Sequence, residues 1–279
     1  MAAQSNSDVY PNSSLGRAVR ILEAFDARNR TLSAKELVEI TEIPLSSLYR
    51  QLNQMLVLGL LEKTQHHRYR KTAKLWALAA SGSATQQLIE LALPYMEELQ
   101  KAVQQGVQLS ILIDTVDVLF IERLRAPKAV MNIMGPGVRV PAKLTSSGLL
   151  LAALSDSATL EAVLAHDVGE HWLVASPPHR QPIHNPSLAE LQETIAVART
   201  TEICRVDSWL AVGVTGISAP IRDAEGSPVA ALSLIIPTEE RLLERITPAL
   251  SVTSTALSRH LKTLSVRFPA LSRFETSDQ

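Results

Sequence analysis

The chain has 279 residues, of which 46% are hydrophobic and 20% are charged, and its formal net charge is −1. This composition excludes an intrinsically disordered protein, and the single cysteine, Cys204, excludes a fold that depends on internal disulfides. There is no apolar run of about 18 residues, which excludes a membrane-spanning helix, so we expect a cytoplasmic protein of two domains.

The first predicted elements are two short helices. We expect a disordered leader over residues 1–12, followed by a helix that Ser13 or Ser14 caps. Ser33 would cap the second helix, and Glu36 stands three residues after it, as in a capping box. Two short helices in succession are typical of the first part of a helix-turn-helix domain.

A third helix is predicted from Leu45 to about Leu58, between a break at Pro44 and a C-cap at Gly59. One face is an apolar stripe formed by Leu45, Leu48, Leu52, Met55 and Leu56. The other face carries groups that bind phosphates and base edges, namely Ser46, Ser47, Tyr49, Arg50, Asn53 and Gln54. An ordinary amphipathic helix would show a similar pattern, but this polar face favours a recognition helix.

The next residues predict a β-hairpin, with strands at Leu60 to Thr64 and Arg68 to Lys71. A hairpin in this position is the wing of a winged helix-turn-helix, where Arg68 would contact DNA. Residues 1–76 hold 11 Lys/Arg against 7 Asp/Glu, whereas the rest of the chain holds 16 against 21. This basic balance favours double-stranded DNA as the partner of the small domain, which we assign to residues 13–72.

The large domain is predicted over residues 84–265, between a linker helix at 73–83 and a tail at 266–279. A long opening helix would kink or restart at Pro94. Further helices are expected near Gly148 and at Ala158–His166, Ser187–Thr200 and Thr238–Leu264. Two hairpins are predicted from strands at Val107–Ile113, Val116–Leu124, Gly216–Ile221 and Pro228–Ile236. This grouping indicates an α+β domain whose antiparallel sheet forms a cup for a ligand.

Both halves of the sequence resemble the IclR family of bacterial regulators. The first half does so in the stretches Leu15–Glu23, Leu32–Leu37, Ile43–Arg50 and Leu58–Glu62. The second half does so in Gly137–Pro141, Ser147–Gly148, Gly213–Val214, Ser218–Pro220, Asp223–Gly226 and Val229–Ser233. The resemblance implies DNA contacts by Ser46, Ser47 and Arg50, with Tyr49 where the family often has His. It also implies a GAF-like effector-binding domain.

An effector pocket follows from the same resemblance. Its implied lining is Asn132, Val140, Ser146, Ser147, Val206, Val214, Gly216, Ser233 and Ile235. Hydroxyls among apolar groups suit a small organic acid or semialdehyde. The helix beginning near Gly148 either offers an anion site at its N-terminus or is simply capped by Ser146 or Ser147.

One stretch departs from the family pattern. Many members carry acidic residues where this chain has Asp207-Ser208-Trp209, and we expect Trp209 to be a core aromatic rather than a pocket wall. Cys204 is expected to be a small buried residue.

The sequence therefore predicts a transcriptional regulator whose affinity for a pseudo-palindromic operator is modulated by a metabolite. From the family resemblance we expect a repressor rather than an activator. A homodimer or a dimer of dimers is expected, with no metal, cofactor or catalytic residue. The alternative is a small-molecule-binding protein or an enzyme that acts through the large domain. The sequence has no G-x-S-x-G, P-loop or H-E-x-x-H motif to support an enzyme.

Overall fold

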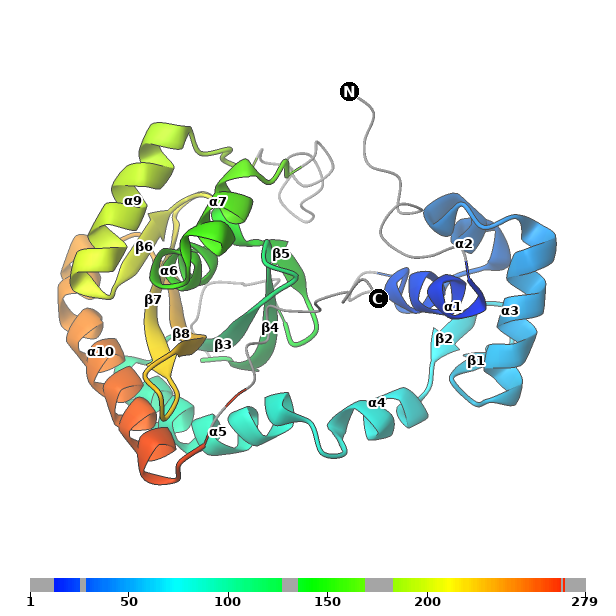
Figure 1. Ribbon diagram of the computed structural model, residues 1–279, viewed down its shortest axis with the longest axis horizontal. Coiled ribbons are helices and arrows are strands. Elements are labelled where there is room, and N and C mark those ends of the chain that lie inside the picture. The colour runs from blue at the N-terminus through cyan, green and yellow to red at the C-terminus, as the bar shows by residue number, and fades with distance from the viewer. Residues whose placement is uncertain (1–12, 26–28, 127–134, 169–182, 267, 269–279) are drawn as a thin grey trace. The chain divides into compact units, whose positions relative to one another are not determined.

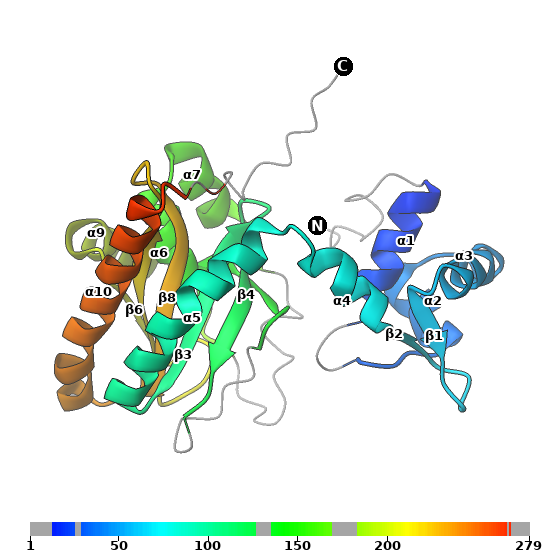
Figure 2. The same ribbon diagram turned by 90° about the horizontal axis from the view of Figure 1, so that it is seen from below.

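The computed structural model describes residues 13–25, 29–126, 135–168, 183–266 and 268. The chain divides into two compact units, one ending at Gln86 and the other beginning at Gln87 (Figures 1 and 2). The predicted leader and Asn132 lie outside the described residues, as does the tail from residue 269.

The first unit is a three-helix core with a two-stranded hairpin. Its elements are α1 (Ser14–Glu23), α2 (Ala34–Thr41), α3 (Leu45–Val57), β1 (Leu61–Lys63), β2 (Tyr69–Lys71) and α4 (Ala73–Ala80). The strands pair antiparallel, and an isolated bridge joins Leu32 to Tyr69. The winged helix-turn-helix order predicted from the sequence is confirmed.

Local sequence explains where these helices begin and end. Ser13 accepts a hydrogen bond from the Gly16 N–H at the start of α1, and Ser33 forms the predicted capping box with Glu36 at α2. After α3, Gly59 takes a φ of 68°, a backbone conformation that glycine adopts readily.

The predicted apolar stripe of α3 needs one correction. Leu48, Leu52 and Met55 are buried, but Leu45 is 50% exposed. Leu45 is the first residue of the helix, so no preceding turn brings it over the core. Gln51 is buried instead, and its side-chain oxygen accepts a hydrogen bond from Ser14 Oγ at 3.0 Å.

The second unit is a six-stranded antiparallel sheet covered by helices on both faces. Its helices are α5 (Ala84–Val103), η1 (Ala142–Leu144), α6 (Ser146–Leu154), α7 (Ser157–Ala165), α9 (Leu188–Thr201) and α10 (Glu240–Thr263). Its strands are β3 (Gly106–Ile113), β4 (Asp117–Leu124), β5 (Arg139–Pro141), β6 (Cys204–Asp207), β7 (Val214–Arg222) and β8 (Pro228–Pro237). The α+β class is confirmed.

The strands lie in the order β5-β4-β3-β8-β7-β6. Both predicted hairpins are present, β3 with β4 and β7 with β8, and the two hairpins join through β3 and β8. The edge strands β5 and β6 escape sequence analysis because they have three and four residues, too few to show an alternating pattern.

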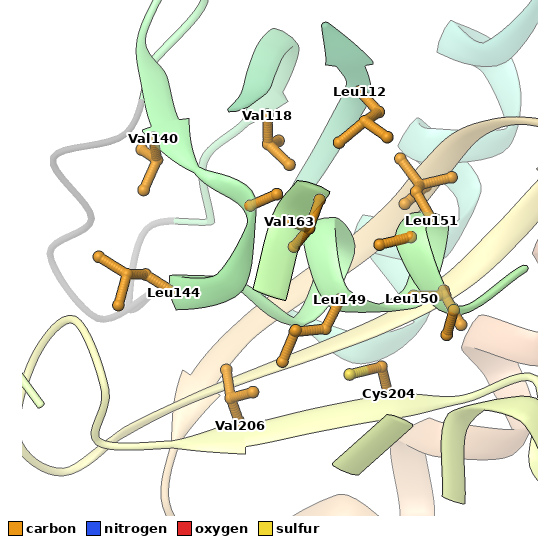
Figure 3. Close-up of a cluster of buried hydrophobic side chains, with 14 of the residues drawn as sticks. Leu112, Val118, Val140, Leu144, Leu149, Leu150, Leu151, Val163, Cys204 and Val206 are labelled. Carbon is orange, nitrogen blue, oxygen red and sulfur yellow. The ribbon is translucent and has the colours of Figure 1, made fainter. Parts of the chain in front are cut away.

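Two layers of helix cover this sheet. Helix α6 lies on one face, while α5 and α10 lie on the other (Figures 1 and 2). Pro94 falls inside α5, which remains one helix rather than restarting. On the α6 face, Leu149 and Leu150 join strand residues such as Val118 and Val206 in a buried apolar cluster (Figure 3). None of the helices in the described residues is long and apolar enough to cross a membrane.

The start of the predicted tail is attached to the second unit. Val266 accepts a hydrogen bond from the Ala224 N–H at 3.2 Å, and Phe268 is 5% exposed.

Candidate DNA-binding and ligand-binding sites

The polar face of α3 points away from the core of the first unit. Tyr49, Arg50 and Asn53 are exposed, as is Ser46, whereas Ser47 is half-buried. This arrangement follows from the helical period, because Leu48, Leu52 and Met55 fix the opposite face in the core. The exposed face combines hydroxyl, guanidinium and amide groups that can read base edges in a major groove.

The predicted wing residue Arg68 makes contacts within the unit. Its guanidinium donates to the Thr31 carbonyl at 2.8 Å and forms an ion pair with Glu36 at 2.9 Å. These contacts tie the wing to the N-terminus of α2. They favour a positioning role for Arg68 in the folded unit.

Glu36 is the acidic centre of this junction. Hydrogen bonds from the backbone and side chain of Ser33, together with Arg68, lower the pKa of Glu36 from 4.5 to about 2. The carboxylate therefore contributes stability above pH 4.5 that is lost as the pH falls toward about 2.

We predict that Glu36→Gln removes this part of the acid sensitivity. The variant keeps a hydrogen-bonding group but has no charge to lose, so its stability falls less than that of wild type when the pH drops from about 6 to about 3. Urea unfolding followed by circular dichroism at both pH values measures the difference. Glu39→Gln is the matched control, because Glu39 on the same helix is 4.0 Å from Lys35. Equal acid sensitivity of Glu36→Gln and wild type would contradict the assignment.

The second candidate site is a chain of buried serine hydroxyls. Ser146 Oγ lies 2.6 Å from Ser218 Oγ, which lies 2.8 Å from Ser233 Oγ. All three residues are at most 4% exposed. The chain links the first residue of α6 to the neighbouring strands β7 and β8.

The other predicted pocket residues share the α6 face of the sheet. A Cβ built on Gly216 would lie 3.0 Å from Ser146 Oγ, 3.6 Å from Val206 Cγ2 and 3.8 Å from Ile235 Cδ1. These side chains therefore converge over the bare backbone of Gly216. Val214 lies two residues before Gly216 and shares its face by the strand alternation.

Val140 and Ser147 complete the described part of the predicted lining. Val140 is fully buried on β5, opposite Val118 of β4, and belongs to the same apolar cluster as Val206. Ser147, at the start of α6, is 2% exposed.

The cap of α6 corrects the sequence prediction. Thr145 is the N-cap, and its Oγ1 accepts from the Gly148 N–H at 3.0 Å. Ser146 and Ser147 are instead the first two helical residues. Three adjacent hydroxyl residues made the choice ambiguous in sequence, since each type caps helices well. The capping role falls to Thr145, which leaves the Ser146 hydroxyl in the serine chain.

Sequence reasoning missed Ser218 of the serine chain, and it also missed polar residues on the neighbouring strand β3. Gln108 and Ser110 lie on β3, paired with Ser233 and Ala231 of β8, and both are at most 1% exposed. Ser110 Oγ has no hydrogen-bond partner among the described residues. A buried hydroxyl of this kind is costly unless a ligand or water binds it. The signal was their alternation with Val107, Leu109 and Ile111.

Asp207, in the stretch that departs from the family pattern, does not face the predicted pocket. Burial opposes its charge, but hydrogen bonds from Arg205 and Thr215 outweigh that effect and lower the pKa of Asp207. Asp207 directly follows Val206 on β6, so its side chain lies on the opposite face of the sheet from Val206 and Gly216. Trp209 is a core residue, as predicted.

Cys204 is also confirmed as a buried residue. Burial raises the pKa of its thiol to about 12, which keeps the thiol protonated and unreactive near neutral pH.

Comparison with known proteins identifies both domains. The IclR helix-turn-helix domain matches residues 14–65, and the family described as bacterial transcriptional regulator IclR C-terminal matches residues 83–259. The Pca regulon regulatory protein of Pseudomonas putida is 28% identical over 254 residues, which cover 89% of this chain and 84% of that protein. The p-hydroxybenzoate hydroxylase transcriptional activator of Acinetobacter baylyi is 24% identical, with 87% and 89% covered.

A solved structure is similar over most of the chain. It is an IclR homologue from Microbacterium hydrocarbonoxydans complexed with 4-hydroxybenzoate, with 31% identity and a TM-score of 0.73. The match covers 89% of this chain and 100% of that one. These relatives are transcriptional regulators and not enzymes, in accord with the sequence prediction. The chain, with its winged helix-turn-helix and its effector-binding domain, belongs to the IclR family of bacterial transcriptional regulators.

Proposed function

We propose that this regulator binds a pseudo-palindromic operator through α3 and releases it in response to a small organic acid. The exposed polar face of α3 carries the DNA part of the proposal. Its predicted contacts are Ser46, Ser47, Tyr49, Arg50 and Asn53, with Arg68 on the wing. The helix presents these groups while its other face is held in the core, which is what entry into a major groove requires.

The ligand part of the proposal rests on the buried serines. A small acid that carries a further oxygen outside its carboxylate could bind that oxygen to the hydroxyls of Ser146, Ser218 and Ser233. Val140 and Val206 would supply apolar walls. Relatives are named for hydroxybenzoate or Pca regulation, and one solved relative contains 4-hydroxybenzoate. We therefore take 4-hydroxybenzoate as the first acid to test.

We also propose that the chain acts as a homodimer, alone or as a dimer of dimers. Helix α4 has no buried residue in this chain, although its sequence is AKLWALAA. Trp76 is 72% exposed and Leu78 is 61% exposed. An apolar helix of this kind gains stability when a second copy covers it.

The proposed sign of regulation is repression. One relative is named an activator, so we test the sign directly. Deletion of the gene should raise expression from a reporter that carries its operator. Lower expression after deletion would make the protein an activator.

A mobility-shift titration tests the proposed function. Wild-type protein should retain DNA from upstream of its own gene better than competitor DNA, and less well as salt increases. Addition of 4-hydroxybenzoate should change the operator affinity about 5- to 150-fold. Phenol, which lacks the carboxylate, is the matched control. Equal retention of operator and competitor DNA would refute operator recognition, and an unchanged affinity in the acid would refute this ligand.

A further inference from the structure

A row of polar residues crosses the α6 face of the sheet. Across neighbouring strands, Arg123 of β4 is paired with Gln108 of β3, Gln108 with Ser233 of β8, and Ser233 with Ser218 of β7. Directly paired residues of a sheet place their side chains on the same face. The row therefore runs through four strands, with a cation at one end and the serine chain at the other.

The position of Arg123 depends on a bulge in β4. Leu109 is paired with Glu122, but Ser110 is paired with Phe120, so Ile121 is the extra residue. The bulge puts Arg123 on the face of Gln108 and Glu122 on the face of Leu109. Without it, the arginine and the glutamate would exchange faces.

Arg123 is held at the rim of this face. Its guanidinium lies beside Gly135, where a Cβ would be 3.5 Å from Nη2. Burial and the neighbouring Arg125 lower the pKa of Arg123, against the attraction of Glu122. Arginine nevertheless stays charged. A partly desolvated cation of this kind is stabilised by an anion that binds next to it.

The nine residues that the family resemblance assigns to ligand binding include no charged side chain. An organic acid brings a carboxylate into this apolar surrounding, and a buried carboxylate needs a cation or several hydrogen-bond donors. Among the row residues, Arg123 supplies that charge, and its planar fork fits a carboxylate with two parallel hydrogen bonds.

We propose that Arg123 binds the carboxylate of the ligand, and that the buried serines bind an oxygen at the ligand's other end. This inference rests on the proposed function. Two strand spacings, roughly 10 Å, separate the backbones of Arg123 and Ser233. A ligand that reaches both residues must extend along the sheet, which suits an acid whose further oxygen lies across one aromatic ring from the carboxylate. The chemical class is thus a para-hydroxylated or para-oxo acid.

The test compares 4-hydroxybenzoate with 4-hydroxybenzamide, its neutral analogue of the same shape. Isothermal titration of the full-length protein should give about 10- to 100-fold tighter binding of the acid than of the amide. Arg123→Gln should reduce this preference to about 3-fold or less. Arg123→Lys keeps the charge but not the planar guanidinium, so this variant should retain part of the preference for the acid. The ratio of two ligands within one variant does not depend on how much of that variant is folded.

Arg125→Gln is the matched control, because Arg125 is exposed two residues away and its loss removes the same net charge. It should keep the preference of wild type. Arg123→Gln with an undiminished preference for the acid, or Arg125→Gln with an equal loss, would overturn the inference and leave the proposed function intact. Wild-type protein that binds neither compound would instead refute the proposed ligand class itself, and the inference with it.

Discussion

Gly148→Ala should destabilise the second unit and abolish its response to ligand. A Cβ at this position would lie 2.3 Å from the Ala142 carbonyl oxygen and 2.4 Å from Ala142 Cα. Both atoms are backbone, so no side chain can rotate away, and α6 must shift from η1. Overpacking of this kind costs about 1–3 kcal/mol, and rigid backbone neighbours favour the upper end.

Urea unfolding measures this loss, and ligand titration measures the response. Gly216→Ala is the matched control, because the added Cβ would lie 3.0 Å from Ser146 Oγ, the end of a side chain that can turn. We expect a smaller loss of stability there. If Gly148→Ala unfolds at the wild-type urea concentration and still binds ligand, the close packing of α6 on η1 is not required.

Arg50→Ala should weaken specific operator binding by about 1–3 kcal/mol, or roughly 5- to 150-fold. Arg50 is exposed on α3 between Tyr49 and the buried Gln51, and a guanidinium can bind a guanine edge with two hydrogen bonds. Competition mobility shifts measure the loss of specificity, because binding to random DNA should fall less than binding to the operator.

Lys101→Ala removes the same charge from an exposed site on α5 in the second unit, and it should leave operator affinity unchanged. Arg50→Lys should fall between wild type and Arg50→Ala. Wild-type affinity in Arg50→Ala would remove this residue from the recognition surface.

Helix α3 could be predicted almost to the residue, because apolar and polar side chains alternate with a helical period between a proline and a glycine. What the pattern could not indicate is that Gln51 is buried and Leu45 is exposed. Both depend on neighbours distant in sequence, since Gln51 is held by Ser14 of α1. Local periodicity therefore predicts which face of α3 is polar, whereas tertiary contacts decide how the opposite face is held in the core.

The ligand site was less predictable. The resemblance to a family gave Ser146, Ser233 and the valines, but it gave neither Ser218 nor Arg123, and the alternation of Gln108 with apolar neighbours does not say which face of the sheet binds the ligand. Register decides their positions, and a one-residue bulge at Ile121 reverses the faces of Glu122 and Arg123. A bulge of this kind has no signature in the sequence of a single strand.

The three serine hydroxyls have a further consequence. In each of the pairs Ser146–Ser218 and Ser218–Ser233, either oxygen can be the donor. All protons in the chain can therefore reverse direction together, so Ser233 can offer a proton to a keto oxygen or accept one from a phenol. Neighbouring hydrogen bonds polarise one another, so the direction of the chain follows the group that the ligand presents to Ser233. The serine end of the site should accept either a hydroxyl or a carbonyl oxygen of a ligand, which leaves discrimination among metabolites to the length and charge of the rest of the molecule.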